Sequence, residues 1–263
     1  MQVNRLSTLF EVTIRENTRN YVLIGLLIFL PIAFITVAIA VTQDALMPIE
    51  LSIDGEPQTV MRGLPAVHGV AMVPLTSTIL AGIVGLLLMQ DVRNTDGRLV
   101  LSGYRAREVI LARLGTLGIL AALVTVVSVG VMAYDVWPEQ PLFFLLSLFV
   151  VTLLYGLVGM LIGVFLDRVA GLWTLLVVSM LDIGLFQSPL FPMGDDSWWV
   201  AILPGHYPME VIFDTGLTAS FDTLTQLGWG LLYLLVVVVV ATLVFSRITE
   251  VRRPIHHSET DHQ

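Results

Sequence analysis

The clearest pattern along the chain is a series of six long apolar stretches separated by shorter polar connections. Each stretch is close to the length that a helix needs to cross a bilayer, at about 1.5 Å per residue. Apolar residues run continuously instead of alternating, which favours helices over the strands of a barrel. The stretches cover residues 21–41, 66–89, 110–133, 142–166, 170–186 and 227–245. The sequence therefore predicts an all-α polytopic membrane protein with a six-span transmembrane domain over residues 21–246.

Shorter patterns flank these spans. Residues 1–20 carry apolar side chains at helical spacing with charges off that stripe, which predicts an interfacial amphipathic helix in preference to a plain extension of span one. Alternation at Ile49, Leu51 and Ile53 indicates a small hairpin between spans one and two. The connection before the last span has two apolar pieces that are too short to cross a membrane, which predicts re-entrant external helices.

The positive charges are distributed asymmetrically among the connections. Of the 13 cationic residues, all of them arginine, only Arg62 falls on the side opposite to the others if the six spans are real. Cytoplasmic connections of membrane proteins carry the excess of positive charge. We therefore expect a multi-pass protein of the cell (plasma) membrane whose termini, with the tail of residues 247–263, are both cytoplasmic.

The opposite, external side is expected to be strongly acidic, and the net charge of the chain is −8. Acid-rich surfaces keep proteins soluble at high salt. Together with arginine in place of lysine, this favours a halophilic prokaryote as the host, although a genomic bias toward arginine codons is the alternative. The acids expected to face outward are Asp44, Glu50, Asp54, Glu56, Asp135, Glu139, Asp195, Asp196, Glu210, Asp214 and Asp222.

The absence of two residue types excludes several kinds of chemistry. The chain has no cysteine, which excludes disulfides and thiolate catalysis. It also has no lysine, so it contains no P-loop of the GxxxxGK[ST] kind. Neither the zinc-hydrolase nor the serine-hydrolase signature occurs. We therefore expect no enzymatic site and no cofactor in this chain, and any ATP to be bound by another protein.

Two features inside the spans stand out. Gly156, Gly159 and Gly163 include a small-xxx-small pair in the fourth span, which indicates close helix packing and, as the alternative, a dimer face. Asp182 is the one ionisable residue well inside a span, and an intramembrane carboxylate is a functional hypothesis by default. It is either a pathway residue that binds a proton, a cation or a basic substrate, or a structural partner of a hydroxyl on another helix.

The connection after the second span combines both signs of charge with an apolar triplet, Leu99–Leu101. Topology requires positive charge but not interleaved acids, so the pattern favours a docking surface for a soluble protein. The residues that we expect to form this surface are Asp91, Arg93, Asp96, Gly97, Arg98, Leu99, Leu101, Arg105, Arg107 and Glu108.

This connection resembles the cytoplasmic loop of ABC type-2 export permeases. In that family an acidic residue and a glycine precede an apolar stretch, and here these places look like Asp91, Gly97 and Leu99–Leu101. A Ser-Pro-like break, an arginine and a glutamate follow in the family, and their places look like Ser102, Arg105 and Glu108. Gly103 stands where the family often has proline. The segment 203–208, Leu-Pro-Gly-His-Tyr-Pro, is similar to the family's Leu-Pro-rich stretch before the last span. The resemblance covers the whole chain.

The resemblance implies the membrane-spanning subunit of an ATP-driven exporter. Two such subunits, identical or different, would form the translocation pathway in the lipid bilayer. A separate P-loop ATPase would bind ATP and Mg²⁺ and dock on residues 91–108; no nucleic-acid partner is expected. A secondary transporter that uses Asp182 as an ion or proton site is one alternative, although the sequence shows no convincing internal repeat. A non-transporting membrane scaffold is the other.

Overall fold

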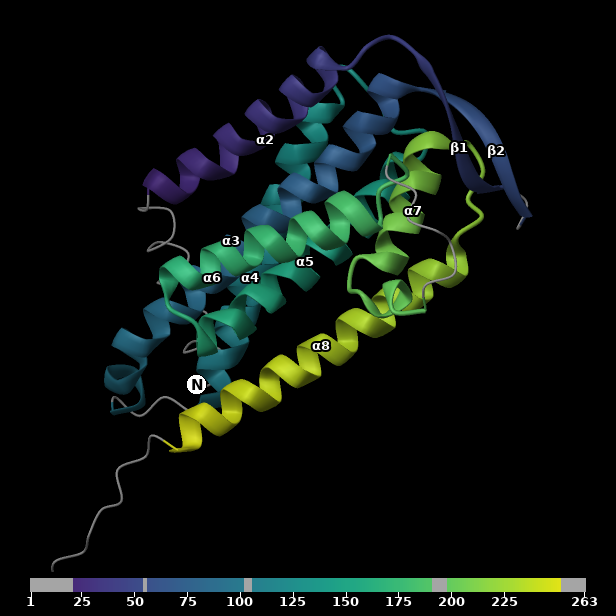
Figure 1. The fold of residues 1–263 in the computed structure, drawn as a ribbon. Helices are drawn as coiled ribbons and strands as arrows, with labels where there is room; N and C mark the ends of the chain where they lie inside the picture. The colour runs from purple at the N-terminus through teal and green to yellow at the C-terminus, as the bar shows by residue number, and fades with distance from the viewer. Residues whose placement is uncertain (1–20, 54–55, 102–105, 191–197, 252–263) are drawn as a thin grey trace, which may run out of the picture.

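The protein is a bundle of long helices that lie side by side, with a β-hairpin at one end (Figure 1). The structure is a computed structural model and describes residues 21–53, 56–101, 106–190 and 198–251. Within these residues, six helices are long and apolar enough to cross a membrane. The prediction of a mostly helical, multi-pass membrane protein is therefore confirmed at this level.

The long helices follow the apolar stretches closely. They are α2 (Tyr21–Val41), α3 (Leu64–Leu101), α4 (Ala106–Met132), α5 (Pro141–Phe165), α6 (Arg168–Ser179) and α8 (Leu224–Val251). The fifth span is completed by η1 (Met180–Phe186), a π-helix that continues α6 without a break. The largest difference from the predicted ranges is at the end of α3, which continues as a helix through Leu101, where a loop from Asp91 was expected.

The hairpin consists of β1 (Leu46–Ile53) and β2 (Glu56–Gly63), paired antiparallel with Ile49 opposite Val60. Ile49 and Leu51 point to the same face of the hairpin and are buried, as their alternation indicates. This hairpin confirms the pattern between spans one and two. It also corrects the prediction of an all-α fold, because the described residues include a two-stranded sheet.

Two short helical segments precede the last span, η2 (Val200–Ile202) and α7 (His206–Leu217). Most of α7 is buried, and it packs against α5, α8 and α3. Figure 1 shows α7 beside the hairpin, while α3 and α8 end at the opposite end of the bundle. The apolar side chains of this helix, Met209, Val211, Ile212 and Phe213, are thus buried against the spans.

The tightest helix contact joins α3 and α5. Gly82 and Gly85 of α3 face Gly159 and Gly156 of α5 so closely that a Cβ at Gly85 or Gly159 would collide with a backbone carbonyl oxygen of the other helix. At these glycines no side chain separates the two helices, so their backbones approach each other directly. The glycines predicted to support close packing do so within the chain.

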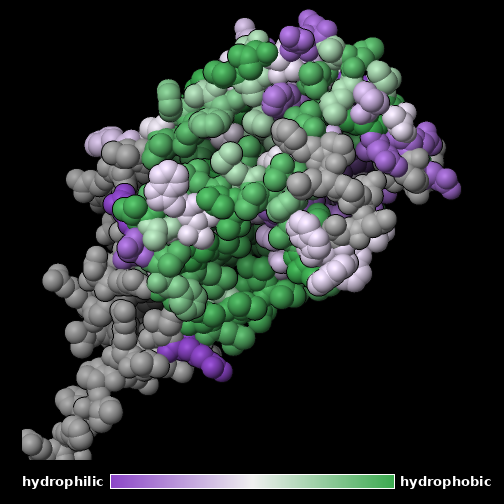
Figure 2. Space-filling view, in the orientation of Figure 1, coloured by the Kyte–Doolittle hydropathy of each residue, from purple (hydrophilic) through white to green (hydrophobic). Residues whose placement is uncertain are grey.

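The outer faces of the bundle are apolar. Only 17% of the apolar window is buried in α2 and in α8, compared with 72% in α3. Figure 2 shows hydrophobic side chains covering the middle of the bundle, with hydrophilic ones gathered toward its ends. Such a surface is suited to lipid, since soluble proteins rarely expose contiguous apolar patches of this extent. The predicted interfacial helix of residues 1–20 and the tail from residue 252 lie outside the described residues.

Candidate functional site

The candidate site is centred on the carboxylate of Asp182, which is 2% exposed although it lies within the fifth span. The hydroxyl of Tyr155 on α5 donates a hydrogen bond to Oδ2 at 2.5 Å. The backbone N–H of Gly205 donates to the same oxygen at 2.9 Å, and the side-chain amide of Gln187 donates to Oδ1 at 3.1 Å. A buried carboxylate is tolerated when donors replace its water, and three donors do so here.

The π-helix brings one of these three donors, Gln187, to the carboxylate of Asp182. The N–H of Gln187 bonds to the backbone oxygen of Asp182 at 3.0 Å, five residues earlier. This wider turn brings the side chain of Gln187 back toward that of Asp182. Single π turns are uncommon and often occur at functional sites. The π-helical backbone and the contact between the side chains of Gln187 and Asp182 therefore depend on each other.

Gly205 brings the N-terminal end of α7 to the carboxylate. It is the residue that precedes the first turn of α7. A Cβ at Gly205 would lie 2.9 Å from Oδ2 of Asp182 and 2.5 Å from Cδ1 of Ile183, so a larger residue does not fit. A negative charge at a helix N-terminus is favoured by the helix dipole and the unpaired N–H groups there. Asp182 thus joins α5, η1 and α7 through one side chain.

A series of side-chain contacts leads from this carboxylate toward the surface. Oε1 of Gln187 lies 3.2 Å from Nδ1 of His206, and Nε2 of His206 lies 3.2 Å from Oε1 of Glu210. Burial raises the pKa of Glu210, and the charge of His206 and a hydrogen bond with Gln226 act in the opposite direction. We refer to Asp182, Tyr155, Gln187, Gly205, His206 and Glu210 as the Asp182 cluster.

A second buried carboxylate fixes the other end of α7. Asp214 is 1% exposed, so its expected place on the acidic outer surface is wrong. The hydroxyl of Thr218 lies 2.5 Å from Oδ1, and Thr223 Oγ1 and the N–H of Asp222 donate to Oδ2 at 2.7 and 3.1 Å. These contacts order the turn between α7 and α8. Other acids expected to face outward, among them Asp44, Glu50 and Asp135, are exposed.

The residues expected to dock an ATPase lie at the end of the bundle opposite to the hairpin. Positions 91–101, which hold Asp91, Arg93, Asp96, Gly97, Arg98, Leu99 and Leu101, form the last turns of α3; Arg107 and Glu108 are in the first turn of α4. Arg105 lies outside the described residues. The side chains in this region are also outside them, so the docking surface stays a prediction. At its edge, Arg113 of α4 donates to the backbone oxygen of Leu88 at 2.6 Å, which joins α4 to α3.

Sequence reasoning identified Asp182 but not its partners. Tyr155 is a polar side chain within an apolar span, and Gly205 follows a proline in a broken segment; both are signals that a search for donors would use. His206 is not among the site residues that the sequence indicates, and the structure brings it into contact with Gln187 and Glu210. The described contacts include a hydroxyl on another helix, which was one of the two interpretations of Asp182.

Comparison of the chain with protein-family models, with curated proteins and with solved structures gives no match. The functional interpretation therefore rests on the sequence and on the geometry described above.

Proposed function

We propose that the chain is the permease subunit of an ATP-driven ABC exporter. Two copies, or one copy and a related chain, would enclose the translocation pathway, and a separate P-loop ATPase would bind ATP and Mg²⁺ in the cytoplasm. The proposal is supported by the six apolar helices, by the absence of lysine, and by the resemblance of residues 91–108 and 203–208 to that family. The distribution of arginine supports an orientation with the hairpin and α7 outside.

The observation that carries the proposal is the continuity of α3. Its apolar window ends at Gln90, but the helix of 38 residues continues to Leu101. At 1.5 Å per residue, the last eleven residues extend about 16 Å beyond that window. The most deeply buried of the six spans thus ends in a charged helical arm. A soluble partner that moves this arm would move the centre of the bundle, because the arm and the core belong to the same helix.

Motion of α3 has a direct route to the opposite end of the molecule. At Gly85 and Gly156 the backbones of α3 and α5 are in direct contact, so no side chain lies between the two helices at this point to absorb a small displacement. One residue before Gly156, Tyr155 contacts Asp182, and through Asp182 the N-terminal end of α7. Under this proposal, α7 and η2 are the re-entrant helices at the outer side, and the Asp182 cluster couples them to the core.

The proposal is tested by replacing Leu99 and Leu101 together with aspartate, which removes the expected apolar seat for the ATPase. We expect the full chain to insert normally but to lose most of the ATPase that co-purifies with the parent protein. Exposed ion pairs contribute only about 0–1 kcal/mol each, so charge reversal at Arg105 or Glu108 alone should act more weakly. A matched pair of changes at His256 and His257 in the tail is the control. Full retention of a P-loop ATPase by the double aspartate variant would contradict the assignment.

A proton-coupled transporter is the second candidate, and the contacts from Asp182 through Gln187 and His206 to Glu210 are the observation that favours it. The two candidates differ in what the chain does alone. In vesicles that contain only this chain, a secondary transporter would move protons in response to a gradient of its substrate, and Asp182→Asn would abolish this movement. A permease subunit without its ATPase would show no such coupled proton flux.

A further inference from the structure

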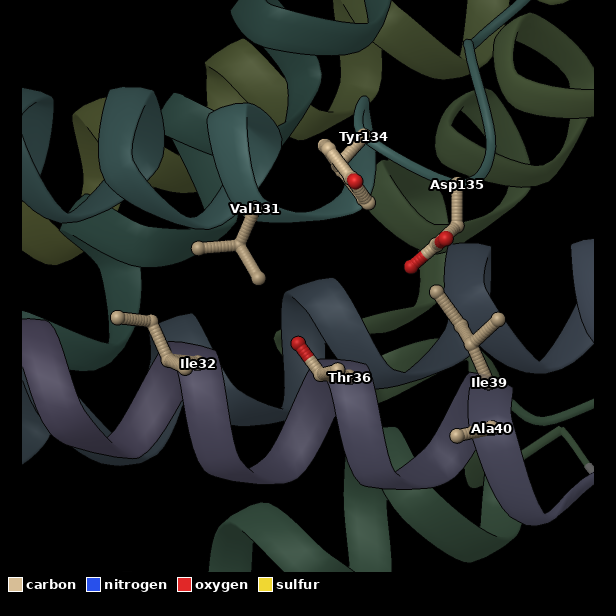
Figure 3. A pocket seen from close by; sticks show the side chains of 7 residues that line it. All are labelled: Ile32, Thr36, Ile39, Ala40, Val131, Tyr134 and Asp135. Atoms are coloured by element: carbon tan, nitrogen blue, oxygen red, sulfur yellow. The ribbon is translucent and has the colours of Figure 1, made fainter.

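A cleft of about 350 Å³ lies between α2 and the end of α4, at the surface of the bundle. Its walls come from one face of α2, from the last turn of α4 and from the connection that follows α4. Figure 3 shows Val131 and the hydroxyl of Thr36 directed into this space, and the carboxylate of Asp135 at one end beside Ile39. The lining residues are Ile32, Thr36, Ile39, Ala40, Val131, Tyr134 and Asp135.

The cleft changes in polarity along its length. From Ile32 to Ala40 it follows α2 for about 12 Å, at 1.5 Å per residue, up to the last residues of that span. This part is apolar except for Thr36. Tyr134 and Asp135 come just after Met132, where the apolar window of α4 ends. In a bilayer that matches these apolar windows, the apolar part would lie at the depth of lipid chains and the acidic end at the depth of headgroups.

The carboxylate of Asp135 is available to a ligand. It is exposed, and within the described part of the chain no hydrogen bond or ion pair involves its side chain. Other exposed acids lie on the same connections at this end of the protein, namely Asp44, Glu50, Glu56 and Glu139, with Arg62 as the described cation among them. Several like charges produce a negative potential that concentrates cations near this end of the protein.

The lining also distinguishes between amphiphiles. A zwitterionic phospholipid would place its phosphate near the headgroup end, but among the described residues no arginine lines the cleft to pair with a phosphate. An ammonium or phosphonium ion needs only the carboxylate. The volume is that of a small-molecule site, and a mostly apolar lining with one charged group is typical of such sites.

We propose that this cleft is a binding site for a lipophilic organic monocation that enters from the outer leaflet. Its apolar part lies against Ile32, Ile39 and Val131, and its cationic centre lies at Asp135. The site concerns binding only, so it is independent of the exporter proposal; its assignment to the outer leaflet rests on the orientation proposed above from the distribution of arginine.

The test uses the full-length chain in nanodiscs of neutral lipid, with tritiated tetraphenylphosphonium as the probe and empty nanodiscs for subtraction. We expect saturable binding by the parent chain. Asp135→Asn should weaken it about two- to fivefold, in the upper part of the range for an exposed ion pair. Asp44→Asn removes an exposed acid that does not line the cleft, and it should leave binding almost unchanged.

A steric pair of variants tests the cleft itself. Ala40→Phe fills the cleft and should weaken binding at least tenfold, whereas Val37→Phe adds the same ring to an exposed position of α2 that does not line it. Thr36→Phe is a second blocking variant if Ala40→Phe fails to give monodisperse protein. Equal binding by the Ala40 and Val37 variants would overturn the proposal. Equal displacement of the probe by hexadecyltrimethylammonium and by hexadecylphosphocholine would also overturn the proposal, because the cleft would then bind any lipid.

Discussion

The hydroxyl of Tyr155 lies 2.5 Å from the carboxylate of Asp182, and both side chains are almost completely buried between α5 and the end of the fifth span. When a buried hydrogen bond loses one partner, the other partner is left without compensation for its lost hydration. This contact therefore bears on stability as well as on the coupling of α7 to the core.

Removal of the Tyr155 hydroxyl should destabilise the protein. Tyr155→Phe keeps the ring in place but deprives Asp182 of a donor, and we expect a loss of about 1.5–3 kcal/mol. Thermal unfolding of the purified protein, followed by circular dichroism, measures the effect. Tyr134→Phe is the matched control because Tyr134 is 91% exposed. If the two variants unfold at the same temperature, the Tyr155 contact contributes nothing.

A methyl group at the α3–α5 contact should force the two helices apart. In Gly159→Ala the new Cβ would meet the carbonyl oxygen of Gly82, and such overpacking costs roughly 1–3 kcal/mol. Gly118→Ala on α4 is the control, since nothing lies within 4 Å of its Cβ position. Alanine is the better helix former, so the control should be neutral or slightly stabilising. The same unfolding assay compares the two variants, and a harmless Gly159→Ala would refute the close contact.

Glu210 should give the protein a measurable pH dependence. Burial raises the pKa of Glu210 above its ordinary value of 4.5, and His206 and Gln226 oppose this shift. The folded state then holds the proton more tightly than the unfolded state does. The resulting stabilisation is present at low pH and is lost as the pH rises through the folded pKa.

Glu210→Gln, which is neutral at every pH, isolates this effect. Relative to this variant, the parent chain should gain stability as the pH falls from about 7 toward 4.5. Glu139→Gln, at an exposed position, is the control. A pH-independent difference between the parent chain and Glu210→Gln would show that the raised pKa has no consequence for folding.

The hairpin and the arm of α3 should lie on opposite sides of the membrane. The chain has no cysteine, so a single cysteine at Gln58 or at Asn94 is the only thiol present. A membrane-impermeant thiol reagent should label the Gln58 variant in intact cells and the Asn94 variant only after permeabilisation. The reverse labelling would mean that the arginine-rich side faces outward, contrary to the proposed orientation.

The sequence predicts those parts of the fold that a simple physical constraint determines. Six apolar stretches predict six helices because a bilayer admits few other structures, and the range 21–41 of the first span is that of α2. The end of α3 was missed because Asn94 and Gly97 are poor helix formers and indicate a loop. The structure continues the helix through both residues, contrary to their local propensity.

The Asp182 cluster is predictable only in part, because several of its residues are far apart in the sequence. A carboxylate within an apolar span is visible in the sequence, so Asp182 could be selected. Two of its three donors come from positions 27 residues earlier in Tyr155 and 23 residues later in Gly205, and no local pattern connects these two with Asp182. Likewise, Asp214 looked like a surface acid because its donors, Thr218 and Thr223, are ordinary loop residues until the turn is folded.

The most direct test of the central claim is site-specific photo-cross-linking from Leu99 in living cells. A photoreactive amino acid at Leu99 would lie on the arm of α3, and the same amino acid at Leu243, an exposed apolar position of α8, is the control. The account predicts a covalent adduct from Leu99, but not from Leu243, with a protein whose sequence contains a P-loop, and a yield that changes when vanadate blocks ATP hydrolysis. Absence of such an adduct from Leu99, or an equal adduct from Leu243, would contradict the account.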